Sequence, residues 1–73
     1  MMRENDSVWV LQAMLKNKRV DWIKKLLALM SLAQIASQES LRILDSYCKN
    51  PDPQMKIYAR LAFAEAKYWA GIN

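Results

Sequence analysis

The segment from Asn50 to Gly71 limits most strongly what this chain can fold into. At its start, Asp52 is a residue type that caps helices, and Pro53 suits the first helical position. At its end, Gly71 readily adopts the left-handed conformation that commonly closes a helix. The segment therefore predicts one long helix over about residues 53–70.

This helix has two apolar faces, and each predicts a different contact. One face contains Met55, Tyr58, Ala59, Ala62, Phe63, Ala66 and Trp69. The opposite face contains Ile57, Leu61, Ala64 and Tyr68. We expect the first face to pack in the core. The second would leave an apolar stripe that monomeric soluble proteins usually avoid, so we expect another protein or a second copy of the chain to cover it. The alternative is that the helices close into a bundle and cover both faces internally.

Three further helices are predicted, over about residues 7–16, 21–36 and 38–49. Their starts carry residue types whose side chains accept hydrogen bonds from the free N–H groups of a first turn. The residues expected to cap them are Asp6 or Ser7, Asp21 and Ser37. Glycine occurs once and proline twice in the 73 residues, which favours helix throughout and one small all-α domain over residues 1–73.

The apolar positions of these helices predict how they pack. The first helix turns Val8, Leu11 and Leu15 to one side, and the third turns Leu41, Leu44 and Cys48. The second is apolar almost all round: Ile23, Leu26, Leu27, Leu29, Met30, Leu32, Ala33 and Ile35. A helix of this kind is usually central to its domain, so we expect the second helix to lie in the middle of the fold.

The sequence also contains an internal repeat of helix pairs. Helices one and three match with a shift of 33 residues, which places Val8 on Leu41 and Trp9 on Arg42. Helices two and four match with a shift of 32, which aligns Ile23, Leu27 and Met30 with Met55, Ala59 and Ala62. A two-helix repeat of this length is typical of α-solenoids, whose units bury apolar faces on their neighbours.

The run Asp52-Pro53-Gln54-Met55-Lys56, with Ala59, Ala62 and Phe63 after it, resembles the first helix of short bacterial HEAT repeats. The stretch from Leu29 to Lys49 resembles the end of such a helix, a tight turn and the second helix of a repeat. The resemblance implies four antiparallel helices stacked as about two HEAT-like hairpins. It also implies a protein-binding role, with second helices lining a binding face. The alternative fold is a closed four-helix bundle.

Residue types exclude most chemistry. There is no histidine, which removes the commonest general base, and one cysteine cannot form an intrachain disulfide. We expect Cys48 to act as a small apolar residue, and we expect no catalytic residue, metal or cofactor. The longest nearly uncharged run, Leu26 to Ala36, is too short to span a bilayer, and residues 1–10 lack the apolar region of a signal peptide. We therefore expect a cytoplasmic protein that neither binds a membrane nor acts on a small-molecule substrate.

The favoured function is a non-enzymatic module that docks a protein partner or a second copy of itself. Its predicted contact residues are Trp9 and Arg42 on one surface and Ile57, Leu61 and Tyr68 on the other. Tryptophan is enriched at binding hot spots, which is why Trp9 is included. The alternative is that Trp9 folds back onto helix two or onto the N-terminal residues.

Two other functions stay open. The net charge is +4, and five basic residues lie within ten positions: Lys16, Lys18, Arg19, Lys24 and Lys25. They predict a nucleic-acid-binding patch in which Trp22 could stack on a base, with a solvated turn as the plainer interpretation. The other function is a small helical immunity or inhibitor protein, which the sequence does not separate from the docking module.

Overall fold

Four helices and the short connections between them make up residues 4–71, the part of the chain that the computed structural model describes, with side chains described from residue 7. The helices are α1 (Glu4–Lys16), α2 (Trp22–Ile35), α3 (Gln38–Lys49) and α4 (Lys56–Trp69). A single 3-10 turn, Pro53–Met55, leads into α4. Within this range there is no strand, so the predicted all-α fold is confirmed.

Two of the predicted helix caps are confirmed by hydrogen bonds. The Asp21 carboxylate accepts from the Ile23 N–H at 3.1 Å, and the Ser37 hydroxyl oxygen accepts from the Ser40 N–H at 3.1 Å. Gly71 has φ 77°, in the left-handed region predicted for the end of the last helix. These capping residues lie at the helix ends that the local sequence predicted.

The predicted start of the first helix is wrong. Helix α1 is already formed at Glu4, so neither Asp6 nor Ser7 can be its N-cap. Acidic residues in a first turn are stabilised by the positive end of the helix dipole, which favours continuing the helix back through Asp6 to Glu4.

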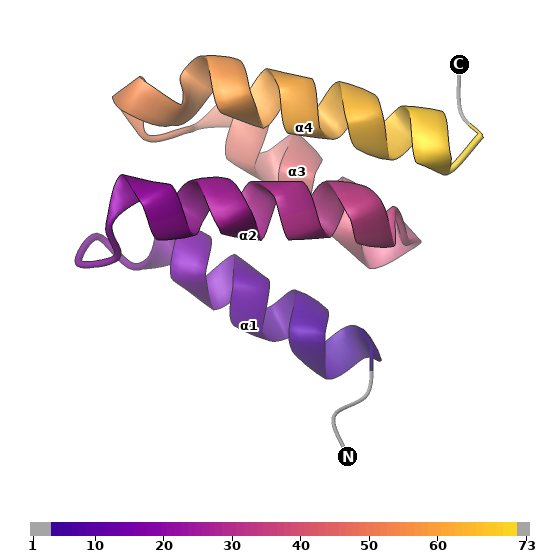
Figure 1. Ribbon diagram of the computed structural model, residues 1–73, viewed down its shortest axis with the longest axis horizontal. Helices are drawn as coiled ribbons and strands as arrows, with labels where there is room; N and C mark the ends of the chain where they lie inside the picture. Colours follow the sequence, from indigo (N-terminus) through magenta and orange to yellow (C-terminus); the bar gives the residue numbers. More distant parts are fainter. Residues whose placement is uncertain (1–3, 72–73) are drawn as a thin grey trace.

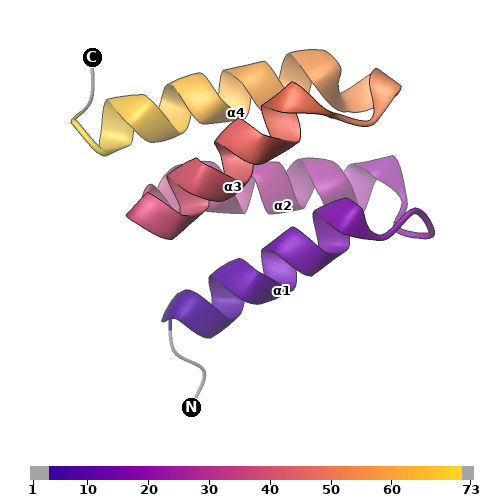
Figure 2. The same cartoon turned by 180° about the vertical axis from the view of Figure 1, so that it is seen from behind.

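The helices form two layers. Helices α2 and α4 lie side by side in one layer, and α1 and α3 lie in the other (Figures 1 and 2). Each connection crosses from one layer to the other, so consecutive helices are antiparallel and helices of one layer are parallel. Within the described residues, α1 and α4 make no contact. The result is a slab whose Cα extents are 32 × 31 × 17 Å.

Helix α2 contacts the other three helices, as predicted. The buried apolar residues are Val8, Leu15, Ala28, Leu29, Leu32, Ala33, Ile43, Leu44, Met55, Ala59, Ala62 and Ala66. Almost all of α4's contribution is alanine, which lets α4 approach α2 and α3 closely. The core lies between the two layers, and it is thin because so many of its side chains are small.

Several residues expected in the core lie elsewhere. Tyr58 and Trp69 are exposed, because Tyr58 lines an outer groove between α2 and α4, and the last turn of α4 extends past the α2–α3 turn (Figure 1). In α3, Leu41 and Cys48 are half-buried, while Ile43 is buried together with Leu44. Helix α3 is therefore rotated slightly towards α1, relative to the predicted face.

The predicted register between the second and fourth helices is also wrong. With a shift of 32 residues, Ile23 is matched with Met55, yet Ile23 is 51% exposed and Met55 0%. Burial instead agrees at a shift of 34, which matches Ile23 with Ile57 and Leu27 with Leu61, all four exposed. The apolar pattern of α2 runs all round the helix, so it fits more than one register and only packing selects the true one.

Candidate protein-docking surface

The outer surface of the α2–α4 layer carries two apolar stripes. On α2, Ile23, Leu27 and Met30 follow one another at intervals of four and three residues, so they share one side of the helix. On α4, Leu61 follows Ile57 after four residues and Tyr68 follows Leu61 after seven, so these three also share one side of the helix. All six side chains are exposed, with Leu61 at 63% and Ile57 at 70%. We call this surface the α2–α4 face.

A shallow groove joins the two stripes. It has a volume of about 180 Å³ and is lined by Leu26, Leu29, Met30, Tyr58, Leu61, Ala62 and Glu65. Leu29 and Ala62 are buried and form its floor, whereas Met30 and Leu61 are exposed and rise on either side. The stripes are thus two walls of one continuous surface.

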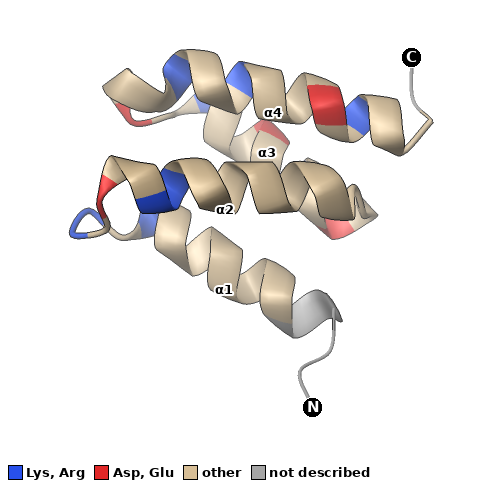
Figure 3. Ribbon diagram, in the orientation of Figure 1, with Lys and Arg blue, Asp and Glu red and all other residues tan. Residues whose placement is uncertain are grey.

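Little charge lies on this face. Helix α2 has no charged residue after Lys25, and its ribbon carries no charge colour over its C-terminal part (Figure 3). Glu65 lines the groove, and its carboxylate accepts the Trp69 indole N–H at 3.3 Å. Trp69 in turn meets Tyr68 edge-on, with ring centroids 5.4 Å apart. The face is apolar at its centre, with an aromatic pair at one end.

The other flank of α4 is different. Lys67 holds its ammonium 4.6 Å from the centre of the Phe63 ring, a cation–π contact. Arg60 and Lys56 stand exposed on the same side of the helix. This basic strip separates the α2–α4 face from the α3 side of the molecule.

Trp9 and Arg42 do not belong to this face. Both are exposed, as predicted, but they lie on α1 and α3 in the opposite layer. The Arg42 guanidinium pairs with Glu39, three residues before it, at 3.2 Å. The predicted contact residues therefore fall on two separate surfaces, and Ile57, Leu61 and Tyr68 are the ones that join a larger apolar area.

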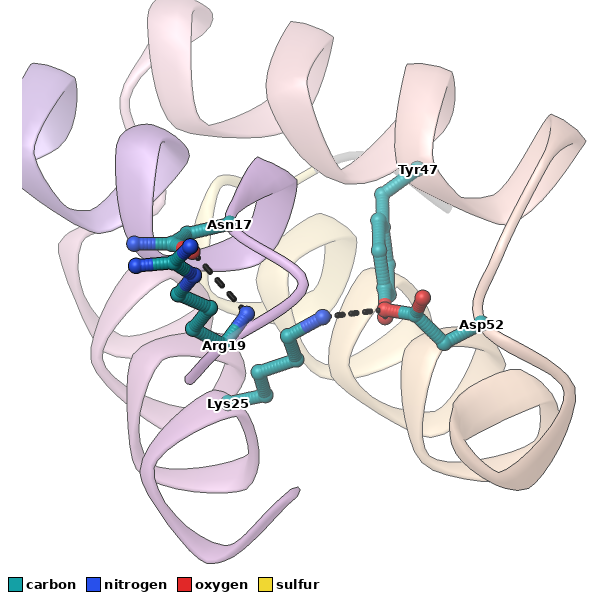
Figure 4. A network of polar contacts seen from close by, with 5 residues as sticks. All are labelled: Asn17, Arg19, Lys25, Tyr47 and Asp52. Atoms are coloured by element: carbon teal, nitrogen blue, oxygen red, sulfur yellow. Dashed lines mark hydrogen bonds and ion pairs between the residues drawn. The ribbon is translucent and has the colours of Figure 1, made fainter. Parts of the chain in front are cut away.

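The basic cluster is divided by the fold. Lys16, Lys18, Arg19 and Lys24 are exposed around the α1–α2 connection, but Lys25 is buried. In that connection, the Asn17 side chain accepts from the Arg19 N–H at 2.9 Å and holds the turn (Figure 4). Lys25 could not reach a phosphate, so its place in the predicted nucleic-acid patch is wrong.

Lys25 belongs to a three-residue network (Figure 4). Its ammonium donates to one carboxylate oxygen of Asp52 at 2.7 Å, and the Tyr47 hydroxyl donates to the same oxygen at 2.6 Å. These hydrogen bonds, first that of Lys25, hold the pKa of Asp52 below its usual range. Burial, with the bond to Asp52, raises the pKa of Tyr47. The network ties α2 and α3 to the turn before α4.

This arrangement corrects the predicted role of Asp52. Its carboxylate makes no cap hydrogen bond to the turn that follows. The backbone carbonyl of Asp52 instead accepts from the Met55 N–H at 2.8 Å. The carboxylate instead receives the Lys25 ammonium, which carries a full opposite charge, together with the Tyr47 hydroxyl.

Sequence reasoning missed Ile23, Leu27 and Met30 as part of the docking surface. They were expected inside the domain because α2 is apolar almost all round. The polar seam of Lys24, Ser31 and Gln34 was the available signal, since each lies beside this stripe on the helix. A seam facing solvent implies that its immediate neighbours are at least partly exposed.

Among the side chains that the structure describes, the cysteine and acidic groups form no second site. Cys48 is half-buried, and burial is the first cause of its raised thiol pKa. Among the described residues, no group of three or more cysteine and acidic side chains could hold a metal ion. None of the helices in that part of the chain combines the length and the apolarity needed to cross a membrane.

No family model matches the chain, and neither the curated proteins nor the solved structures contain a match.

Proposed function

We propose that this protein is a non-enzymatic interaction module that docks a protein partner through the α2–α4 face. The observation that carries the proposal is the exposure of six large apolar side chains on one surface two helices wide. Monomeric soluble proteins rarely leave a contiguous apolar patch of this kind uncovered. The groove between the stripes is a depression that side chains of a complementary surface can fill.

The proposal includes a stacking of two HEAT-like hairpins in a cytoplasmic protein. The alternation of the helices between two layers supports the stacking, and a single cysteine in the 73 residues suits a reducing compartment. An immunity or inhibitor role would use the same kind of face and is included in the proposal. Nucleic-acid binding is the weaker alternative, because only four of the five clustered basic side chains are exposed.

The test is capture from a lysate of the source cells on immobilised full-length chain. Leu61→Asp places a charge at the centre of the α2–α4 face, and Trp9→Asp places the same charge on the opposite layer. We expect Leu61→Asp to lose the captured protein and Trp9→Asp to retain it. Equal capture by both variants and the wild-type chain would contradict the proposed surface.

The nucleic-acid alternative is tested separately. Phosphate contacts are strongest at low salt, so binding to mixed DNA and RNA is measured at about 50 mM salt and again at about 200 mM. Under the docking proposal, no salt-dependent binding is expected. Tight binding that weakens with salt and is lost on changing Lys18 and Arg19 to alanine would favour the alternative.

A further inference from the structure

The α2–α4 face has the size of one side of a stable protein interface. Its exposed large apolar side chains are the six of the two stripes and Tyr58, which lines the groove between them. Each exposes between 41% and 70% of its surface. At roughly 100 Å² apiece this is about 700 Å², against about 800 Å² per partner in a standard interface. Full coverage by a second folded surface is therefore in proportion to what the face offers.

The charge distribution favours a partner with the same apolar character. The chain has a net charge of +4, but the basic residues nearest this face, Lys24 and Arg60, stand beside the stripes rather than on them. Glu65 is the one charged residue among those lining the groove, and a largely apolar centre with a polar rim is the arrangement of interfaces between identical subunits.

The two stripes also repeat one another. Ile57 and Leu61 are the burial equivalents of Ile23 and Leu27, 34 positions earlier, on a parallel helix of the same layer. The face therefore consists of two similar halves. In a two-fold contact the same patch meets itself, and a face of two similar stripes offers each stripe an apolar partner of its own kind.

The shape of the molecule leads to the same partner. The slab is 17 Å thick but 32 × 31 Å across, and the α2–α4 face is one of its broad sides. Two slabs joined on this side form a particle about as thick as it is wide. That pairing buries the apolar stripes between two alanine-containing layers and adds the apolar burial that a domain of this size usually lacks.

We propose that the α2–α4 face binds the same face of a second copy of this chain, forming a two-fold symmetric dimer. The inference rests on the proposed function and names its partner. Leu27 and Leu61 lie at the centre of the contact, and Lys24 and Arg60 remain at its rim.

The test is the molar mass of the full chain in solution, measured by sedimentation from about 1 µM to about 0.5 mM. We expect a mass of twice 8.5 kDa at high concentration, falling to 8.5 kDa on dilution. Leu27→Asp and Leu61→Asp should each weaken the dimer by at least about 30-fold, as for a hot-spot residue. Trp9→Asp, which charges an equally exposed apolar residue of the other layer, should leave the dissociation constant within about threefold.

The other outcomes are distinct. A wild-type chain that stays at 8.5 kDa over the whole range overturns the dimer, whatever the variants do. A dimer that survives the combined change of Leu27 and Leu61 overturns the assigned face. Circular dichroism confirms that each variant remains helical, and Leu27→Ser with Leu61→Ser replaces any variant that does not. A monomer that still captures another protein in a Leu61-dependent manner overturns the second copy but leaves the proposed function intact.

Discussion

Ala36 is held in an unusual backbone conformation at the end of α2. It has φ 48° and ψ 31°, and it is the one non-glycine residue with positive φ in the described chain. A side chain in this left-handed region costs about 1–2 kcal/mol. Glycine would remove this cost, but part of the gain would be lost because the unfolded chain has more conformational entropy with glycine. We therefore expect Ala36→Gly to raise the free energy of unfolding by about 0.5–1 kcal/mol, measured by urea titration.

The matched control is the same change inside a helix. Ala64 is exposed in the middle of α4, where glycine is disfavoured. Ala64→Gly should lower the free energy of unfolding by about 1 kcal/mol. A loss of stability at both positions would mean that the turn after α2 does not impose the left-handed conformation in solution.

The Lys25–Asp52–Tyr47 network should make stability depend on acid. Because the pKa of Asp52 is lower in the folded than in the unfolded state, its stabilisation is complete above the unfolded pKa of about 4. It is lost as the pH falls through the lower folded pKa. At pH 7, Asp52→Asn should cost about 1–3 kcal/mol, since it leaves the buried Lys25 ammonium without its counter-charge. Urea titrations at about pH 7, 5 and 3 should show a smaller acid loss in the variant than in the wild-type chain.

Asp45 supplies the comparison for this effect. It pairs with Lys49, four residues on, at 3.3 Å, but both side chains are largely exposed. Asp45→Asn should change the free energy of unfolding by less than about 0.5 kcal/mol at pH 7. Equal effects at Asp45 and Asp52 would show that burial of Lys25 adds nothing to the ion pair.

At the scale of elements, the packing of α4 depends on small side chains. Ala59 and Ala62 are buried where α4 lies against α2 and α3, so a larger side chain would force the helices apart. Ala59→Leu should cost about 1–3 kcal/mol through overpacking, measured as a lower urea midpoint. Ala13→Leu, at an exposed position of α1 in the other layer, should stay within about 0.5 kcal/mol of the wild-type chain. A neutral Ala59→Leu would place this face of α4 outside the core.

The elements themselves were largely predictable, because their signals are local. Asp21 and Ser37 lie at helix starts, and the boundaries of α2 and α3 follow from them. The exposure of Ile23, Leu27 and Met30 was not predictable from α2 alone, since it depends on how α4 and α1 settle around it. The turning of Asp52 towards Lys25 joins residues 27 positions apart, which no local pattern contains. The stripe of Ile57, Leu61 and Tyr68 was predictable as an apolar face of one helix. Its extension onto α2 was not predictable, because it depends on α2 and α4 lying side by side in one layer.

At the scale of the whole molecule, a thin slab has much surface for the core it encloses. Five of its buried apolar residues are alanines: Ala28, Ala33, Ala59, Ala62 and Ala66. A small domain with such a core is near the limit of independent stability. Association through the α2–α4 face would therefore add a substantial part of the total free energy of unfolding.

This coupling predicts that the thermal stability of the wild-type chain depends on its concentration. For a dimer that dissociates as it unfolds, each tenfold increase in concentration adds about 1.4 kcal/mol to the free energy of unfolding per dimer, so the Tm rises. We expect this rise by circular dichroism between about 2 and about 200 µM. Leu61→Asp should have a lower Tm that is the same at both concentrations, because it unfolds as a monomer. Trp9→Asp should keep the concentration dependence of the wild-type Tm. A wild-type Tm that does not change with concentration would contradict the coupling of stability to dimer formation.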